Sequence, residues 1–264
     1  MGGHVNRRGI VRLLLILIAA WGVLSTTAVA AFVFAHETNP DHRAILKMGI
    51  ALILIWCVVG GGLMWWLRDR FVAWARRIPL GWRTRFVLLC IAFAMLEEAV
   101  TTSLTNLAPW FGGVTDAARI TASKNYLVVV FQHSVIAFVP LFLCWGWLLS
   151  RYDFHPPEVL LLFGLNGTLA ETLSFGPQNL IQVGMWTFVY GLMAYLPACT
   201  VPEDRPARPV RWWCWLLAVF LPLVFIIPLA VWLVAWIVRR AWNRLRGLRA
   251  KSSGASQHDD LRPR

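Results

Sequence analysis

Long apolar runs alternate with short polar stretches along the 264-residue chain. A helix of about 20 apolar residues spans the roughly 30 Å hydrocarbon core of a bilayer. A helix also satisfies its backbone hydrogen bonds internally, as lipid requires. The pattern therefore predicts an all-α fold, a polytopic transmembrane helical bundle, with apolar runs at residues 10–34, 44–67, 86–108, 126–149, 159–173, 180–198 and 212–238.

The composition supports lipid rather than water as the solvent of these runs. Hydrophobic residues make up 58% of the chain and charged residues 14%, whereas soluble proteins average about 45–50% and about 25%. We expect residues 1–250 to form a single transmembrane helical domain. Residues 251–264 are polar and contain glycine and serine, so we expect a disordered cytoplasmic tail.

The net charge of +12 is concentrated at the ends of the apolar runs. Arg7, Arg8 and Arg12 lie before or at the start of the first run, six arginines lie within residues 68–85, and a basic segment at 239–251 follows the last run. Cytoplasmic loops carry an excess of Lys and Arg. Both termini are therefore predicted to be cytoplasmic, in a multi-pass protein of the cell membrane.

This placement of charge also indicates the partners. Anionic lipid headgroups at the cytoplasmic face of the bilayer are expected to contact the basic flanks. No nucleic acid is expected, because no basic stretch away from the membrane flanks is interleaved with base-stacking aromatic residues.

The number of crossings must be even if both termini lie on one side, and seven runs violate this condition. The run at 159–173 is short and precedes the helix-breaking cluster Ser-Phe-Gly-Pro-Gln-Asn at 174–179, which favours a half-helix or re-entrant segment. Alternatively, Pro222 and Pro228 break the last run into a hairpin. We favour six full crossings plus a broken or re-entrant segment near 159–179, with eight crossings as the alternative.

Two interpretations of the first run stay open. Ala28-Val29-Ala30 resembles a signal-peptidase site, so residues 1–30 are either a cleaved signal peptide or a retained anchor. We favour the anchor, because the apolar run continues past this point through Phe32 and Phe34.

Four ionisable residues stand out inside the apolar runs: Glu97, Glu98, His133 and Glu171. Each costs about 2.5–3.5 kcal/mol at mid-bilayer, so each is a functional-site hypothesis. From the predicted orientation and a rise of about 1.5 Å per residue, Glu97, His133 and Glu171 all fall at one level in the outer half of the bilayer. We therefore expect one cluster.

Helical spacing supports this cluster. Glu97 and Thr101 are separated by four residues, as are Glu98 and Thr102, and Asn106 continues the second row. These residues form one polar face, which must point into the bundle because lipid cannot satisfy it. Around Glu171, the residues at helical spacing are small or polar, which favours close helix packing; they are Gly164, Gly167, Thr168 and Ser174.

Adjacent carboxylates and a histidine in a low-dielectric site can share protons or bind a divalent metal. Glu98, His133 and Glu171 are the candidate metal ligands. The catalytic candidates are Glu97, Glu98, His133 and Glu171, of which a glutamate would act as general base. The supporting polar residues are Thr101, Thr102, Asn106 and Asn166.

The order of these residues resembles the CPBP glutamate intramembrane proteases, which include CAAX-processing enzymes. Glu97-Glu98 matches the di-glutamate motif, His133 the helix-borne histidine, and Asn166 or Glu171 stands at the third polar motif. Thr102 and Val129 replace the arginine and phenylalanine of the family's first two motifs. The resemblance covers residues 95–175 and implies hydrolysis of a membrane-protein or peptide substrate, with Glu97 or Glu98 activating water.

Two further functions stay open. A small-solute or proton-coupled transporter is indicated by the break between residues 159 and 182, because discontinuous helices form midplane binding sites. An accessory subunit of a membrane complex is the third hypothesis. For Glu97 and Glu98, a purely structural network with neighbouring Thr and Asn side chains is the alternative to a functional site.

Overall fold

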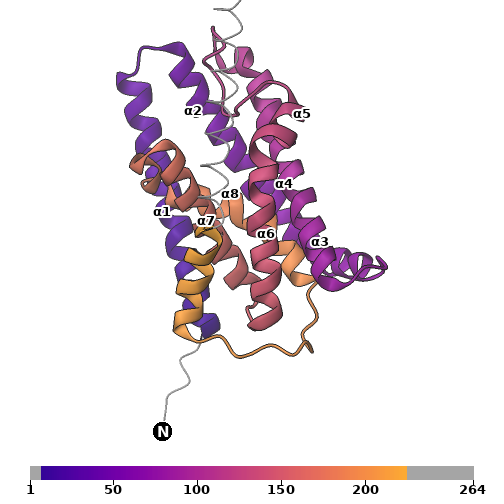
Figure 1. Cartoon of the computed structure of the whole chain (residues 1–264). Helices are drawn as coiled ribbons and strands as arrows, with labels where there is room; N and C mark the ends of the chain where they lie inside the picture. Colours follow the sequence, from indigo (N-terminus) through magenta and orange to yellow (C-terminus); the bar gives the residue numbers. More distant parts are fainter. Residues whose placement is uncertain (1–6, 225–264) are drawn as a thin grey trace, which may run out of the picture. The chain divides into compact units, whose positions relative to one another are not determined.

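The computed structural model describes residues 7–224, and the description below is confined to them. Secondary structure in this range is helical, apart from an isolated bridge between Tyr152 and Arg208. α2 continues through a π-helical stretch, Ile53–Gly60, into α3, and α5 continues through a second one, Val129–His133, into α6. The helices are α1 (Arg7–His36), α2 (Pro40–Leu52), α3 (Gly61–Arg76), α4 (Trp82–Asn106), α5 (Tyr126–Val128), α6 (Ser134–Arg151), α7 (Pro156–Phe175) and α8 (Val183–Cys199) (Figure 1).

The prediction of an all-helical protein is confirmed for this part of the chain. Four helical segments are long and apolar enough to cross a membrane: Arg7–His36, Pro40–Arg76, Trp82–Asn106 and Tyr126–Arg151. Val183–Cys199 and Trp212–Val224 are shorter apolar helices. The rest of the last predicted run and the predicted tail at 251–264 lie outside the described residues.

The long helices expose their apolar surfaces instead of burying them. Only 6% of the most apolar 18-residue stretch of α1 is buried. Val23, Phe32, Trp65 and Trp66 are 71%, 65%, 70% and 70% exposed. Soluble monomers rarely expose contiguous apolar surface on this scale, so the exposed faces are compatible with contact with lipid.

The helices meet at two ends that differ in charge. At one end, which we call the Arg-rich end, the start of α1, the α3–α4 turn, the α6–α7 turn and residues 200–211 lie together (Figure 1). There Arg85 donates to the Thr200 carbonyl at 3.3 Å. At the opposite end, the Asp41 carboxylate accepts the Val114 N–H at 2.7 Å and fixes the loop after α4.

α7 and α8 form a helical hairpin whose interface is made by glycines. A Cβ on Gly164 would lie 2.1 Å from the Thr187 carbonyl oxygen, and one on Gly191 would lie 2.4 Å from that of Leu160. The small face predicted around Gly164 and Gly167 therefore packs within the bundle. The turn begins at Gly176, whose φ of 108° favours glycine.

The tip of this hairpin stops part-way along α1. At the Arg-rich end, Arg7 of α1 pairs with Glu158 of α7 at 2.9 Å. At the tip, the Trp21 indole donates to the Ile181 carbonyl at 2.9 Å. The helical rise from Arg7 to Trp21 is about 21 Å, and α1 continues about 22 Å further to His36. The predicted break is thus at the tip, residues 176–182, while α7 is continuous up to Phe175.

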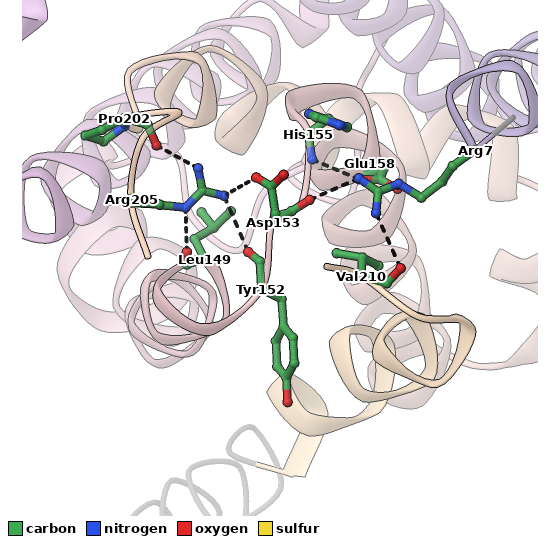
Figure 2. A network of polar contacts seen from close by, with 9 residues as sticks. All are labelled: Arg7, Leu149, Tyr152, Asp153, His155, Glu158, Pro202, Arg205 and Val210. Carbon is green, nitrogen blue, oxygen red and sulfur yellow. Dashed lines mark hydrogen bonds and ion pairs between the residues drawn. The ribbon is translucent and has the colours of Figure 1, made fainter. Parts of the chain in front are cut away.

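Glu158 anchors the start of this hairpin. Its carboxylate accepts the His155 N–H at 2.8 Å, completing a capping box at the start of α7, and it also pairs with Arg7 (Figure 2). The Glu158 side chain is 2% exposed. A carboxylate buried this deeply must be both paired and hydrogen-bonded, and these two contacts supply that.

We predict that Glu158→Ala lowers the free energy of unfolding by about 1–3 kcal/mol, because it removes a helix cap and leaves the Arg7 guanidinium without its carboxylate. Thermal unfolding of the detergent-solubilised protein measures this. Asp116→Ala is the control: its pair with Lys124 at 2.7 Å is exposed, so the unfolding temperature should not change. Equal unfolding temperatures for both variants would contradict the assigned role of Glu158.

We also predict opposite effects of alanine at two helical glycines. A Cβ on Gly167 would lie 2.2 Å from the Tyr190 ring, whereas a Cβ on Gly49 of α2 meets nothing within 4 Å. Gly167→Ala should destabilise the protein by about 1–3 kcal/mol through overpacking. Gly49→Ala should be neutral or stabilising by up to about 1 kcal/mol. Thermal unfolding of the two variants side by side tests the tight α7–α8 interface. An unchanged unfolding temperature in Gly167→Ala would refute it.

Candidate functional site

Three carboxyl groups from two helices lie together inside the helical bundle. Glu97 and Glu98 of α4 are 4% and 8% exposed, and Glu171 of α7 is half-buried. Glu97 interacts electrostatically with both other carboxyls, and Glu171 also interacts with Glu98. Three of the four predicted catalytic residues are therefore brought together.

Hydroxyl groups surround these carboxyls. Thr101 Oγ1 donates to Glu98 Oε2 at 3.1 Å, and the Ser134 hydroxyl of α6 bonds to the same carboxyl. The Tyr190 hydroxyl of α8 donates to Glu171 Oε1. The site, which we call the carboxylate cluster, thus consists of Glu97, Glu98, Thr101, Ser134, Glu171 and Tyr190 and draws on four helices.

Helical rise places these residues at one level. From Arg85, at the Arg-rich end, Glu97 lies about 18 Å up α4; from Glu158, Glu171 lies about 20 Å up α7. From Thr200, which accepts a hydrogen bond from Arg85, Tyr190 lies about 15 Å up α8. The cluster therefore lies beside the tip of the α7–α8 hairpin.

Tyr190 and Ser134 are the two members of the cluster that the sequence did not indicate. A tyrosine in an apolar run ordinarily serves packing, so only its partner reveals its role. The sequence feature that could have indicated Tyr190 is Gly167, one helical turn before Glu171. The absence of a side chain there leaves room for the Tyr190 ring. Close packing of the ring on Gly167 directs the hydroxyl towards Glu171.

His133 does not join the carboxylates. It is exposed and lies at the end of the π-helical stretch Val129–His133, and its φ of −129° and ψ of −81° depart from helical values. A π-helical turn inserts a residue into the helical register. The prediction for His133 assumed regular α-helical spacing and therefore did not include this insertion. The neighbouring Ser134 reaches Glu98 instead.

Among the described residues, the cluster's carboxyls also have no cationic partner. None of the five ion pairs among residues 7–224 involves Glu97, Glu98 or Glu171. Within the same range, no three His, Cys, Asp or Glu side chains come together in an arrangement that could hold a metal ion. The proposed ligand set of Glu98, His133 and Glu171 is accordingly not assembled.

The predicted supporting residues have different roles. Thr101 belongs to the cluster, and Thr102 is buried with no hydrogen-bond partner for its hydroxyl in the described part of the chain. Asn106 is exposed and donates to the Lys124 carbonyl at 3.1 Å, so it holds the following loop. Asn166 accepts from the Trp145 indole at 2.8 Å and donates to the Val219 carbonyl at 2.7 Å, so it links helices away from the cluster.

Comparisons of the chain with protein-family models, with curated proteins and with solved structures found no match in any of the three. The resemblance to the glutamate intramembrane proteases is therefore neither supported nor opposed by a relative.

Proposed function

We propose that the protein is a multi-pass protein of the cytoplasmic membrane whose residues 7–224 form four crossing segments and one re-entrant hairpin. The crossing segments are the four long apolar ones, and the hairpin is α7–α8, which starts and ends at the Arg-rich end. Basic residues favour the cytoplasmic side, so the Arg-rich end faces the cytoplasm. Four crossings and a returning hairpin keep the start of α1 and residues 200–211 on the same side.

This topology predicts a labelling pattern for single cysteines. Each is introduced into a variant whose five native cysteines have been replaced. Leu80→Cys and Asp204→Cys should react with a membrane-impermeant maleimide only from the cytoplasmic side, because both belong to the Arg-rich end. Asp116→Cys should react only from outside. Labelling of Asp204→Cys from outside would contradict a hairpin that returns to its side of entry, since α8 would then cross the membrane.

We further propose that the carboxylate cluster exchanges protons within the bilayer and couples this exchange to the movement of a small solute. The observation that supports this most directly is the meeting of Glu97, Glu98 and Glu171 inside the bundle, with no ion-pair partner among residues 7–224. Desolvation and mutual repulsion oppose the ionisation of several such carboxyls at once. Groups held in this way gain or lose protons when the polarity or shape of their surroundings changes.

The hairpin tip brings polar groups next to Glu171. Asn179 at the tip donates to the Glu171 carbonyl at 3.4 Å and accepts from the Trp186 indole at 3.3 Å. Polar groups at a helix break near the middle of the bilayer are where transporters bind solutes and coupling ions. A solute bound at the tip would act directly on Glu171.

The test is proton movement into vesicles that contain the purified protein and a pH-sensitive dye. With an imposed solute gradient, we expect proton flux that depends on the solute and falls at least about tenfold in Glu171→Gln and Glu97→Gln, because an amide cannot exchange a proton. His133→Ala is the matched control and should retain the flux, since His133 is exposed and outside the cluster. Wild-type flux in both glutamine variants would exclude this role for the cluster.

Intramembrane peptide hydrolysis is the second candidate, favoured by the different environments of the two adjacent glutamates. Glu98 is held by Thr101 and Ser134, whereas the charges that reach Glu97 are those of the other two carboxyls. Such a difference suits one acid and one base. This candidate predicts cleavage of a membrane-embedded peptide that is lost in Glu98→Gln and, if the family resemblance holds, also in His133→Ala. Proton-coupled transport predicts no effect of the histidine change.

A further inference from the structure

A cavity of about 990 Å³ opens at the Arg-rich end between α1, α3, α7 and α8. This is at the upper limit of the usual range of ligand cavities. None of the six residues of the carboxylate cluster lines it. It is therefore separate from the site described above.

The charged residues around the cavity leave an excess of positive charge. Four arginines line it, Arg8, Arg12, Arg68 and Arg76, together with the acids Asp69, Glu158 and Glu203. Asp69 pairs with Arg68 at 3.1 Å, and Glu158 pairs with Arg7 at 2.9 Å. Among residues 7–224, no carboxylate forms an ion pair with Arg8, Arg12 or Arg76. These three guanidinium groups are available to an anion.

His155 reports the same positive field. Burial lowers the pKa of its imidazole below the usual value, and the nearby Arg7, Arg8 and Arg205 lower it further, opposed by Asp153. Figure 2 shows His155 and Glu158 of the cavity lining beside a polar network, in which Arg205 donates to Asp153 at 3.1 Å and Arg7 is held by Glu158 and the Val210 carbonyl. Glu158, which lines the cavity on this side, is fixed by its contacts with Arg7 and with the His155 N–H.

Further from the Arg-rich end than the arginines, the cavity wall is apolar. Leu15, Ile16 and Ala19 of α1 face Val72 and Ala73 of α3 across it. The rise along α1 from Arg8 to Ala19 is about 16 Å, which passes from the headgroup level into the hydrocarbon. A ligand that fills this space must carry a negative group at one end and an apolar chain at the other.

We propose that this cavity binds one anionic glycerophospholipid of the cytoplasmic leaflet, with its phosphate between Arg8, Arg12 and Arg76 and an acyl chain along the apolar wall. Phosphate suits guanidinium groups because it accepts paired hydrogen bonds from their fork. Basic pockets between membrane helices on the cytoplasmic side recognise lipid headgroups in the same way. The proposal rests on the proposed membrane topology but not on the chemistry of the carboxylate cluster.

The experiment compares lipids on the purified full-length protein in detergent, with binding followed by native mass spectrometry and by the rise in unfolding temperature. Dioleoylphosphatidylglycerol should be retained and should raise the unfolding temperature, and dioleoylphosphatidylcholine should do neither. The triple variant Arg8→Gln, Arg12→Gln, Arg76→Gln should bind phosphatidylglycerol at least about tenfold more weakly. Equal binding of the two lipids would overturn the proposal.

The matched control is the triple variant Arg70→Gln, Arg77→Gln, Arg83→Gln. It removes the same charge from the same end of the molecule, but none of these arginines lines the cavity. It should bind phosphatidylglycerol as the wild type does. An equal loss in both triple variants would mean attraction by the whole surface rather than by the cavity, and would overturn the proposal.

Two more measurements test whether the ligand has an acyl chain and whether a free phosphate can replace it. Ala73→Phe fills the apolar wall without changing any charge and should weaken phosphatidylglycerol binding; unchanged binding would mean that no acyl chain enters. Glycerol 3-phosphate and inorganic phosphate should not displace the lipid at millimolar concentration. Displacement by either would identify a free phosphate site and contradict the lipid proposal. Flux in the vesicle assay reports separately on the carboxylate cluster.

Discussion

The close packing of α7 against α8 is the contact on which the rest of the site depends. With glycine at 164, 167 and 191, the two backbones approach until each glycine touches its neighbour directly. Larger side chains there would separate the helices and move the Tyr190 hydroxyl away from Glu171. In lipid there is little hydrophobic force to hold two helices together, so this dispersion contact and the hydrogen bonds beside it must do so.

The two carboxyls of α7 show how position along a helix decides the surroundings of an acid. Glu158 lies at the Arg-rich end, where Arg7 and the His155 N–H can neutralise and cap it, so it serves the fold. Glu171, four turns further, meets a tyrosine and two other acids. A buried charge without an opposite partner is costly, and proteins keep such groups where protonation has a function.

Sequence reasoning succeeded where one physical rule decided the outcome. The apolar runs predicted the helices. The helical spacing of Glu97 and Thr101, together with the estimated depth of each acid in the bilayer, predicted that Glu97, Glu98 and Glu171 lie together. It failed where a local irregularity changes the register, as in the π-helical stretch before Ser134, which leaves His133 exposed. It also missed Tyr190, because the partner of a tyrosine depends on tertiary packing. Six crossings are not confirmed: among residues 7–224, four segments have the required length and hydropathy, and part of the last apolar run lies outside this range.

The central claim is that α7–α8 enters the membrane, carries Glu171 to the level of Glu97 and Glu98, and returns. The depth of its tip tests this most directly. A nitroxide attached at Gln178→Cys in the reconstituted protein can be compared with labels at Leu80→Cys and Asp116→Cys by its collisions with oxygen and with a water-soluble nickel complex. We expect the tip label to collide with oxygen more and with nickel less than the other two. A tip label as accessible to nickel as the label at position 116 would place the tip in water and contradict the account.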